Sequence, residues 1–352
     1  MALTVGVIGC GMIARFHFEG LEKAGARVKW ICDLNEAAAA PFVARFKATY
    51  TADYRRILDD PQVQAVFVLT FSPSHKELCL AAIAAGKAVI CEKTLATNAD
   101  DALAIVRAAE SKGTIFYTAY MKRFLPAVEK AKTLLPAIGR IVSTHIRVRQ
   151  PWGDVWSAMP ASGMLHTPAG GRSPLIEKLG GGILVAGGSH ILDLVCHFLG
   201  RPRRVHALMH VPAPRDYDLL TTAHFATDNG PCLFEAMMSP LTRGGFLRDG
   251  WDERVEITGV RGRLEVFSPM WDRLDQKPSL VVHYDEATGT ETEHRFPPAS
   301  AFTREVAFFV GNIARGEQGS QSRLTGYDVD ELIASITRSA QTGQALDVNW
   351  RT

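Results

Sequence analysis

The sequence lacks several features that would place it in a specialised class of protein. It contains no apolar run of the ~20 residues that cross a bilayer, and it begins with an apolar strand pattern that leaves no room for a signal peptide. Its six cysteines form no Cys-x-x-Cys pair, and its histidines show no zinc-ligand spacing, so we expect free thiols and no metal. A net charge of only +2 argues against a nucleic-acid partner. We therefore expect a cytoplasmic protein.

What the sequence does contain is a glycine-rich turn between the apolar run 3–8 and a helical pattern. The turn consists of Gly9, Cys10, Gly11, Met12, Ile13 and Ala14. Gly9 permits the tight turn, Gly11 lets the backbone approach a pyrophosphate at the positive end of the helix, and Ala14 keeps helix and strand close. This pattern predicts a dinucleotide site.

A carboxylate stands where such a site needs one. The strand predicted over 27–32 ends at Asp33, roughly 20 residues beyond the turn, where a carboxylate accepts hydrogen bonds from a ribose hydroxyl. It would repel a ribose phosphate, so we expect NAD in preference to NADP. The alternative is that Asp33 is only an N-cap or turn residue before the helix at Glu36.

The first third of the chain alternates apolar strands with helical patterns, which is typical of a doubly wound parallel sheet. Further strands are predicted at 65–70, 88–91 and 114–119, and helices at 73–85 and 100–111. We assign residues 1–123 to this nucleotide-binding (Rossmann) domain. Ligands of such sheets lie beyond the carboxyl ends of the strands, and the residues expected on that rim are Gly9, Asp33, Thr70, Lys93 and Tyr120.

From residue 124 the pattern changes to alternation with period two, which favours half-buried antiparallel strands. Such segments are 141–149, 205–210, 219–225, 254–258 and 280–284. We therefore assign 124–352 to an α+β domain with an open, mainly antiparallel sheet for substrate binding and oligomerisation. Two late helices are expected at 302–314 and 328–342. Whether they pack back on the first domain is an alternative that the sequence leaves open. The Ser-, Pro- and Gly-rich stretch 156–171 predicts a long loop near the site.

Several ordered motifs resemble one family across nearly the whole chain, the glucose-fructose oxidoreductase, inositol dehydrogenase and MocA-like (Gfo/Idh/MocA) oxidoreductases. Besides the glycine-rich turn, the resemblance rests on Cys91-Glu92-Lys93-Thr94-Leu95, Tyr120-Met121-Lys122-Arg123-Phe124-x-Pro126, Gly180-Gly181-Gly182, and Gly188-Ser189-His190-x-x-Asp193. The resemblance implies hydride transfer between NAD and a secondary hydroxyl of a sugar, cyclitol or related polyol, with the active site between two domains.

The resemblance also implies roles for individual residues. Lys93 and His190 correspond to the proton-handling residues, which fits the chemistry of a desolvated amine and an imidazole that titrate near neutral pH. The cofactor set is Gly9, Gly11, Met12, Ile13, Ala14, Asp33, Thr70, His75, Glu92, Lys93, Tyr120 and Met121.

The expected substrate-binding set joins these motifs to an aromatic segment that suits sugar rings. It consists of Lys93, Lys122, Trp152, Asp154, Trp156, His190 and Asp193. The segment 147–156 could equally be a strand edge followed by a turn. Asp193, three residues after His190, could orient that histidine or form a structural ion pair.

Two departures from the family pattern bear on the activity. Thr94 replaces the proline after the lysine, and if that proline is cis in the family, threonine is expected to be trans. Ala186 replaces the aspartate four residues before the histidine, which removes a carboxylate from the expected site.

Three activities stay open: a dehydrogenase, a glycosidase that oxidises its substrate transiently and recycles NAD, and a regulator that binds NAD and a sugar without turnover. The family commonly forms dimers or tetramers through the second-domain sheet, so we expect a homo-oligomer.

Overall fold

The computed structural model describes residues 2–153, 155–156, 180–213 and 215–352. Their contacts divide the chain into two compact units, which are described separately. Unit 1 is Met1–Met121 with Phe302–Asp330, and unit 2 is Lys122–Ala301 with Glu331–Thr352. No helix within the described ranges is long and apolar enough to span a membrane. The domain boundary expected at 123/124 stays a prediction.

Unit 1 is built on a six-stranded parallel sheet with the order β3-β2-β1-β4-β5-β6. Its strands are β1 (Thr4–Ile8), β2 (Arg27–Cys32), β3 (Thr49–Thr51), β4 (Ala65–Val68), β5 (Ala88–Glu92) and β6 (Phe116–Ala119). Every residue of β1 and β4 is buried, as expected for central strands covered on both faces. The predicted doubly wound fold is confirmed.

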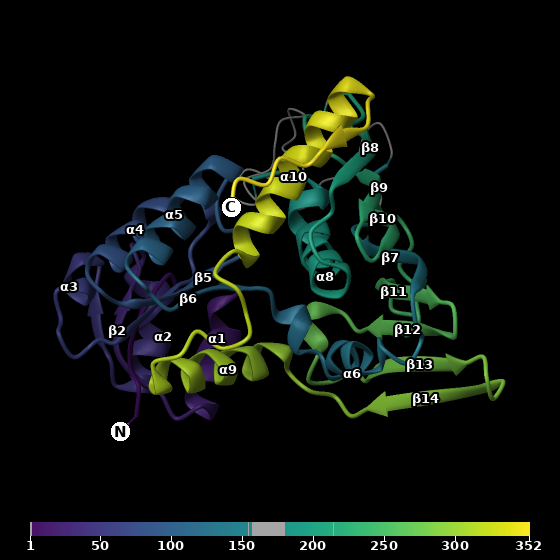
Figure 1. The fold of residues 1–352 in the computed structure, drawn as a ribbon. Coiled ribbons are helices and arrows are strands. Elements are labelled where there is room, and N and C mark those ends of the chain that lie inside the picture. Colours follow the sequence, from purple (N-terminus) through teal and green to yellow (C-terminus); the bar gives the residue numbers. More distant parts are fainter. Residues whose placement is uncertain (1, 154, 157–179, 214) are drawn as a thin grey trace. The chain divides into compact units, whose positions relative to one another are not determined.

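Helices cover both faces of this sheet, with α4 and α5 on one face and α1, α2 and α9 on the other (Figure 1). Their bounds are α1 (Ala14–Lys23), α2 (Glu36–Phe46), α3 (Arg55–Leu58), α4 (His75–Ala84), α5 (Ala99–Ser111) and α9 (Ala301–Arg315), followed by the start of α10 (Thr325–Thr342). Phe18 of α1 stacks on Phe42 of α2 at 4.2 Å, and Phe16 stacks on Phe302 of α9 at 4.6 Å. These aromatic contacts join α1 to its two neighbours.

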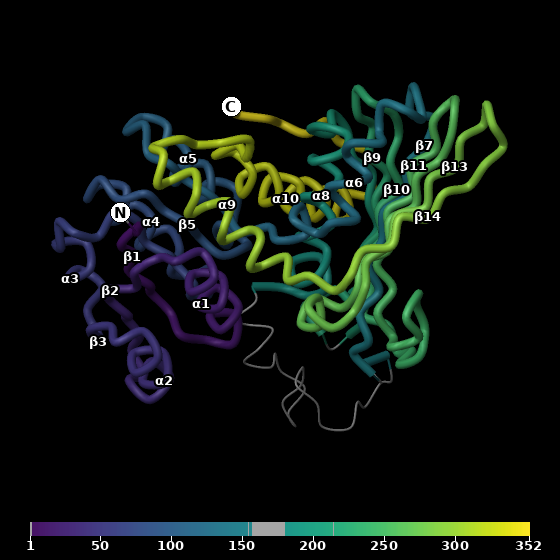
Figure 2. The backbone as a smooth tube through the Cα atoms, turned by 90° about the horizontal axis from the view of Figure 1, so that it is seen from below, coloured from purple at the N-terminus to yellow at the C-terminus, as the bar shows by residue number. Residues whose placement is uncertain are grey.

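Unit 2 is built on a nine-stranded sheet with the order β14-β13-β12-β11-β7-β10-β9-β8-β15 (Figure 2). Its strands are β7 (Ile141–Pro151), β8 (Arg204–His210), β9 (Leu220–Thr227), β10 (Gly230–Ser239), β11 (Asp252–Gly259), β12 (Gly262–Ser268), β13 (Ser279–Asp285), β14 (Thr290–Phe296) and β15 (Leu346–Asp347). All neighbours pair antiparallel except β7 and β10, so the predicted mainly antiparallel sheet is confirmed.

Helices α6 (Pro126–Leu134) and α8 (Ser189–Leu199) pack on one face of this sheet, α6 over β12, β13 and β14, and α8 over β7 and β10 (Figure 1). A π-helical turn, Leu184–Gly188, leads directly into α8. Short 3-10 turns lie at Ser72–Ser74, Met121–Phe124 and Trp271–Arg273.

The opposite face of the unit 2 sheet carries paired charges and exposed apolar side chains. Arg147 pairs with Asp252 at 3.1 Å, and Leu208 and Leu233 are exposed on β8 and β10. Alternation along the strands places these side chains on one face. Oligomerisation through this sheet stays a prediction.

Candidate functional site

The glycine-rich turn of unit 1 has the geometry that an anion-binding turn requires. Gly9 has φ 100°, and a Cβ there would lie 2.8 Å from the carbonyl of Leu69, so only glycine fits. No described atom lies within 4 Å of a Cβ built on Gly11, which leaves its backbone open to a ligand. Met12 is 67% exposed, and among the described residues no side chain caps the N-terminus of α1 at Ile13. The N–H of the buried Ala14 donates to Gly11 O at 3.0 Å and that of Phe16 to Ile13 O at 3.1 Å, so the part of this turn that is open to a phosphate is the backbone before Ala14.

Asp33 follows β2 and joins that strand to the turn. Its Oδ2 accepts the N–H of Cys10 at 2.6 Å, and its Oδ1 accepts the N–H of Asn35 at 2.8 Å. The N-cap of α2 is Asn35, whose side chain accepts the N–H of Ala37, so the N-cap alternative for Asp33 is wrong. The hydrogen bond from the N–H of Asn35 agrees with the alternative that Asp33 is a turn residue. The hydrogen bond from the N–H of Cys10 also places the Asp33 carboxylate beside the glycine-rich turn.

The loop after β5 carries Lys93. The prediction of a trans peptide bond before Thr94 is wrong, because the Lys93–Thr94 peptide bond is cis. Contacts distant in sequence hold this loop: Thr94 O lies 2.9 Å from His75 Nδ1, and its hydroxyl lies 3.0 Å from that of Ser72. Asp330 Oδ2 accepts the N–H of Ala96 at 2.8 Å. The sequence pattern reports none of these contacts, which is why the expectation failed.

Lys93 itself is half-buried at the end of this strand. Burial lowers the pKa of Lys93 to about 8, and the neighbouring Glu92 carboxylate opposes this shift. An amine with such a pKa can accept and release a proton near neutral pH.

His75 is buried, with Nδ1 near Thr94 O and Nε2 3.0 Å from Thr70 O. Its two ring nitrogens therefore lie against the loops after β5 and β4, and the buried ring presents neither of them to solvent. Burial lowers the pKa of His75. A neutral imidazole has only one N–H, so it donates to one of these two carbonyls at a time.

The remaining residues of the predicted cofactor set follow the carboxyl ends of neighbouring strands. Thr70 follows β4, and its hydroxyl accepts a hydrogen bond from Ser74 at 2.7 Å. Tyr120 and Met121 follow β6 and are buried. Because the strands are parallel, the turn, Asp33, Thr70, Lys93 and Tyr120 share one edge of the sheet.

Sequence reasoning missed His17, a fully buried residue of α1. Its Nε2 lies 2.6 Å from Glu92 Oε1, while Glu92 Oε2 accepts the N–H of Lys93 at 3.0 Å. The available signal was a polar residue on the apolar face of the first helix, three residues beyond Ala14.

In unit 2, His190 lies half-buried in the first turn of α8, and Asp218 organises the glycine turn before it. Asp218 O accepts the N–H of Ile183 at 3.1 Å, and its Oδ2 accepts the N–H of Leu184 at 3.0 Å. A Cβ on Gly182 would lie 2.3 Å from Asp218 O, so glycine is required there. Burial raises the pKa of Asp218, while hydrogen bonds to its carboxylate oppose the rise. Asp218 therefore fixes the entry to the π-helical turn that leads to His190.

The side-chain amide of Gln150 lies next to this π-helical turn, in which Ala186 stands where the family pattern has an aspartate. A Cβ on Gly187 would lie 2.3 Å from Gln150 Nε2, and Trp152 Nε1 donates to Gln150 Oε1 at 3.0 Å. Gly187 stands three residues before His190 in the sequence. Gln150 is a second residue that sequence reasoning did not select.

The sequences of both parts of the chain match known proteins. A family model described as "Oxidoreductase family, NAD-binding Rossmann fold" matches residues 3–120, and the GFO/IDH/MocA C-terminal domain matches residues 128–265. An inositol 2-dehydrogenase of Ralstonia nicotianae is 35% identical, covering 97% of this chain and 95% of its own length. The chain belongs to the Gfo/Idh/MocA oxidoreductase family.

Further relatives agree with this membership. An inositol 2-dehydrogenase of Acidothermus cellulolyticus is 37% identical, over 93% of this chain and 89% of its own length. The solved structure of a levoglucosan dehydrogenase, in complex with NADH and levoglucosan, has a TM-score of 0.82 and 24% identity, over 99% of this chain and 100% of that one. That structure supports the fold.

Two residues predicted to bind substrate in this Gfo/Idh/MocA protein form buried ion pairs. Lys122 Nζ lies 2.8 Å from Glu253 Oε2, with side chains 1% and 2% exposed. Arg123 donates to both oxygens of the fully buried Asp193, at 2.6 to 3.0 Å. The structural ion pair considered for Asp193 is therefore present.

The aromatic segment is only partly described. Trp156 Nε1 donates to Met238 O at 2.6 Å, and its ring stacks on His210 at 5.3 Å. Asp154 and residues 157–171 of the predicted loop lie outside the described residues.

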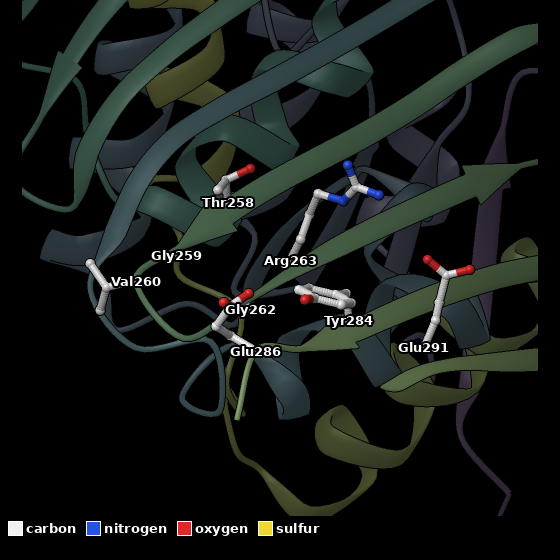
Figure 3. A pocket seen from close by; sticks show the side chains of 8 residues that line it. All are labelled: Thr258, Gly259, Val260, Gly262, Arg263, Tyr284, Glu286 and Glu291. Carbon is white, nitrogen blue, oxygen red and sulfur yellow. The ribbon is translucent and has the colours of Figure 1, made fainter. Parts of the chain in front are cut away.

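A surface hollow of about 630 Å³ lies elsewhere in unit 2, at the ends of the β11–β12 and β13–β14 hairpins (Figure 3). It is lined by Thr258, Gly259, Val260, Gly262, Arg263, Tyr284, Glu286 and Glu291. None of these lining residues belongs to the predicted site. Within the described part of the chain, no group of three or more His, Cys, Asp or Glu side chains could hold a metal.

Proposed function

We propose that this Gfo/Idh/MocA protein is an NAD-dependent dehydrogenase that oxidises a secondary hydroxyl of a cyclitol or sugar. The observation that carries the proposal is Lys93, whose pKa of about 8 suits proton transfer and whose loop shares a sheet edge with the open glycine turn. The names of the relatives that match most of the chain support a cyclitol as the substrate class.

The residues present fit a dinucleotide. The backbone of the glycine-rich turn before Ala14, open at Gly11, would receive the pyrophosphate, and the carboxylate of Asp33 would accept a ribose hydroxyl. When bound, the nicotinamide supplies the hydride acceptor. A 2′-phosphate would meet the negative charge of Asp33, so NAD is the proposed cofactor.

In this proposal Lys93 and His190 accept and transfer the proton of the alcohol. The neutral amine of Lys93 accepts the hydroxyl proton as hydride leaves carbon, and His190 passes a proton to or from solvent. Burial lowers the pKa of Lys93 to about 8 against the opposing effect of the Glu92 carboxylate, so both the amine and the ammonium form are accessible near neutral pH. The amide of Gln150 offers hydrogen bonds beside Ala186, where the family pattern has an aspartate.

The test is a substrate panel with purified protein. Cyclitols, aldoses, uronates and aryl glycosides are offered with NAD or NADP, and reduced cofactor is followed by absorbance. We expect net NADH with at least one cyclitol or sugar. Release of an aglycone without net NADH would instead indicate the transient-oxidation glycosidase, and binding without any product would indicate the regulator.

The proposal predicts opposite pH dependences for the two directions. Oxidation needs the neutral amine of Lys93, so kcat/KM decreases as the pH falls through about 8. Reduction needs the ammonium as proton donor, so its rate decreases as the pH rises through the same value. Initial rates across a pH series measure both, and profiles that are flat on both sides of this value would contradict the role of Lys93.

A second prediction concerns cofactor choice. Asp33→Asn keeps one acceptor oxygen, which can still take the N–H of Cys10, and it loses the acceptor for the N–H of Asn35 together with the negative charge that should bind the ribose. A hydrogen bond to a charged group contributes about 1.5–3 kcal/mol, so KM for NAD should rise about 10- to 100-fold. KM for NADP should rise less, because the repulsion of its phosphate is removed. Glu36→Gln, an exposed carboxylate three residues away, is the matched control, and equal effects of both variants would refute the assignment.

A further inference from the structure

Glu92, the last residue of β5 and the neighbour of Lys93 in the sequence, forms a buried pair with His17 of α1. His17 is 0% and Glu92 6% exposed, and His17 Nε2 lies 2.6 Å from Glu92 Oε1. The other oxygen of Glu92, Oε2, accepts the main-chain N–H of Lys93 at 3.0 Å. One carboxylate therefore connects the first helix of unit 1 to the backbone of the proposed catalytic lysine.

The surroundings of His17 fix its ring. Phe67 of β4 and Phe302 of α9 lie edge to face with the imidazole, at centroid distances of 6.2 and 6.1 Å. A carboxylate in such an apolar setting is costly unless it is hydrogen-bonded, and removing one partner of a buried pair costs more than the net contribution of the pair. The bond from His17 is thus a strong constraint on where the Glu92 carboxylate sits.

We propose that His17 is a positioning residue for Lys93 and acts through Glu92. Its ring N–H holds the Glu92 carboxylate in one orientation, so that the second carboxylate oxygen anchors the Lys93 backbone and the carboxylate stays beside the lysine. This inference rests on the proposed function only in treating Lys93 as the proton-handling group.

The charges around the pair set the sign of the expected effect. Burial lowers the pKa of Lys93 and of His75 on α4, and the negative charge of Glu92 opposes both shifts. Burial raises the pKa of the neighbouring Cys91 thiol, and the same charge adds to that rise. On the α9 side, Phe302 faces His17, and the buried Glu305 lies three residues further along that helix. Removal or displacement of the Glu92 carboxylate therefore lowers the pKa of Lys93 below its wild-type value.

Three variants separate the steps. Glu92→Gln removes the charge and keeps the size of the side chain. His17→Leu removes the hydrogen-bond donor to Glu92, so the carboxylate is no longer held in one orientation beside Lys93. In His17→Gln an amide N–H can replace the ring Nε2–H, so this variant should rescue the wild-type behaviour. The matched control is His224→Leu, an exposed histidine of β9 in unit 2.

The readout needs no cofactor and no turnover. Competitive acetylation of the full-length, cofactor-free protein, quantified for Lys93 by mass spectrometry across pH, gives the midpoint of its titration. We expect about 8 in wild type, a midpoint lower by about one unit in Glu92→Gln, and a shift in the same direction in His17→Leu. His17→Gln and His224→Leu should stay at the wild-type value. Circular dichroism of each variant confirms that it is folded.

The same order should appear in the pH midpoint of kcat/KM for alcohol oxidation. Unchanged Lys93 midpoints in folded Glu92→Gln and His17→Leu would overturn the inference. If His17→Leu does not fold, a shifted midpoint in His17→Gln, or an unshifted one in Glu92→Gln, overturns it instead. Failure of the proposed function shows differently, because wild type would then form no NADH with any substrate while the labelling midpoints still follow the pair.

Discussion

Replacing Lys93 with methionine is expected to lower kcat/KM for alcohol oxidation by about 10²- to 10⁴-fold, the usual contribution of a positioned acid or base. Methionine keeps much of the aliphatic length of lysine and removes the amine, whose pKa of about 8 lets it take the hydroxyl proton. The proposed pyrophosphate contacts come from the backbone of the glycine-rich turn before Ala14, so NAD affinity should change little. Steady-state rates and fluorescence titration with NADH measure the two effects separately.

The matched control for this prediction is Lys76→Met, an exposed lysine of α4 that pairs with Asp101 on the surface. It should retain wild-type rates. A Lys93→Met variant that keeps its rate, or that loses NAD affinity as much as rate, would show that the lysine is not the proton-handling group.

The second large effect is on stability and concerns the pair Arg123–Asp193 in unit 2. Asp193→Ala should lower the free energy of unfolding by about 3–5 kcal/mol, because it leaves the guanidinium without the fully buried carboxylate that accepts its three hydrogen bonds. Urea unfolding followed by fluorescence and circular dichroism gives the difference. The double variant Arg123→Leu/Asp193→Leu should recover part of the loss, since it removes both charges.

An exposed ion pair of the same unit provides the comparison. Arg203 and Asp228 lie 3.0 Å apart, with side chains 68% and 76% exposed. Asp228→Ala should cost no more than about 1 kcal/mol, because water screens such a pair. Similar small losses for Asp193→Ala and Asp228→Ala would contradict the importance of burial at Asp193.

The sequence allowed the fold class to be predicted because its strongest signals are local. The continuous apolar runs at β1 and β4 and the alternating burial along β9 and β11 follow directly from the period of their side chains. The strands β10 and β12 were not among the predicted segments, although burial along β10 also alternates. Strands without such a signal were missed as well. β3 has three residues and β15 has two, while β14, with the sequence TETEHRF, is polar and mostly exposed at the sheet edge.

The candidate site was predicted less completely, since part of it depends on contacts between distant segments. The glycine turn and Asp33 have a fixed spacing, and both lie at the expected edge of the sheet. By contrast, the bond between His17 and Glu92 joins residues 75 positions apart, and that between Leu184 and Asp218 joins residues 34 apart. A single buried histidine resembles a core residue in the sequence, and only its partner shows what it can do.

Deuterium transfer tests the central claim most directly. A cyclitol or sugar that carries deuterium on the carbon of the reacting hydroxyl is incubated with the protein and NAD, and the reduced cofactor is analysed by mass spectrometry. The account predicts one deuterium in each NADH formed, together with the matching ketone, and a strong decrease of both in Lys93→Met. Conversion of the substrate without labelled NADH, or binding without conversion, would contradict a dehydrogenase that transfers hydride to NAD.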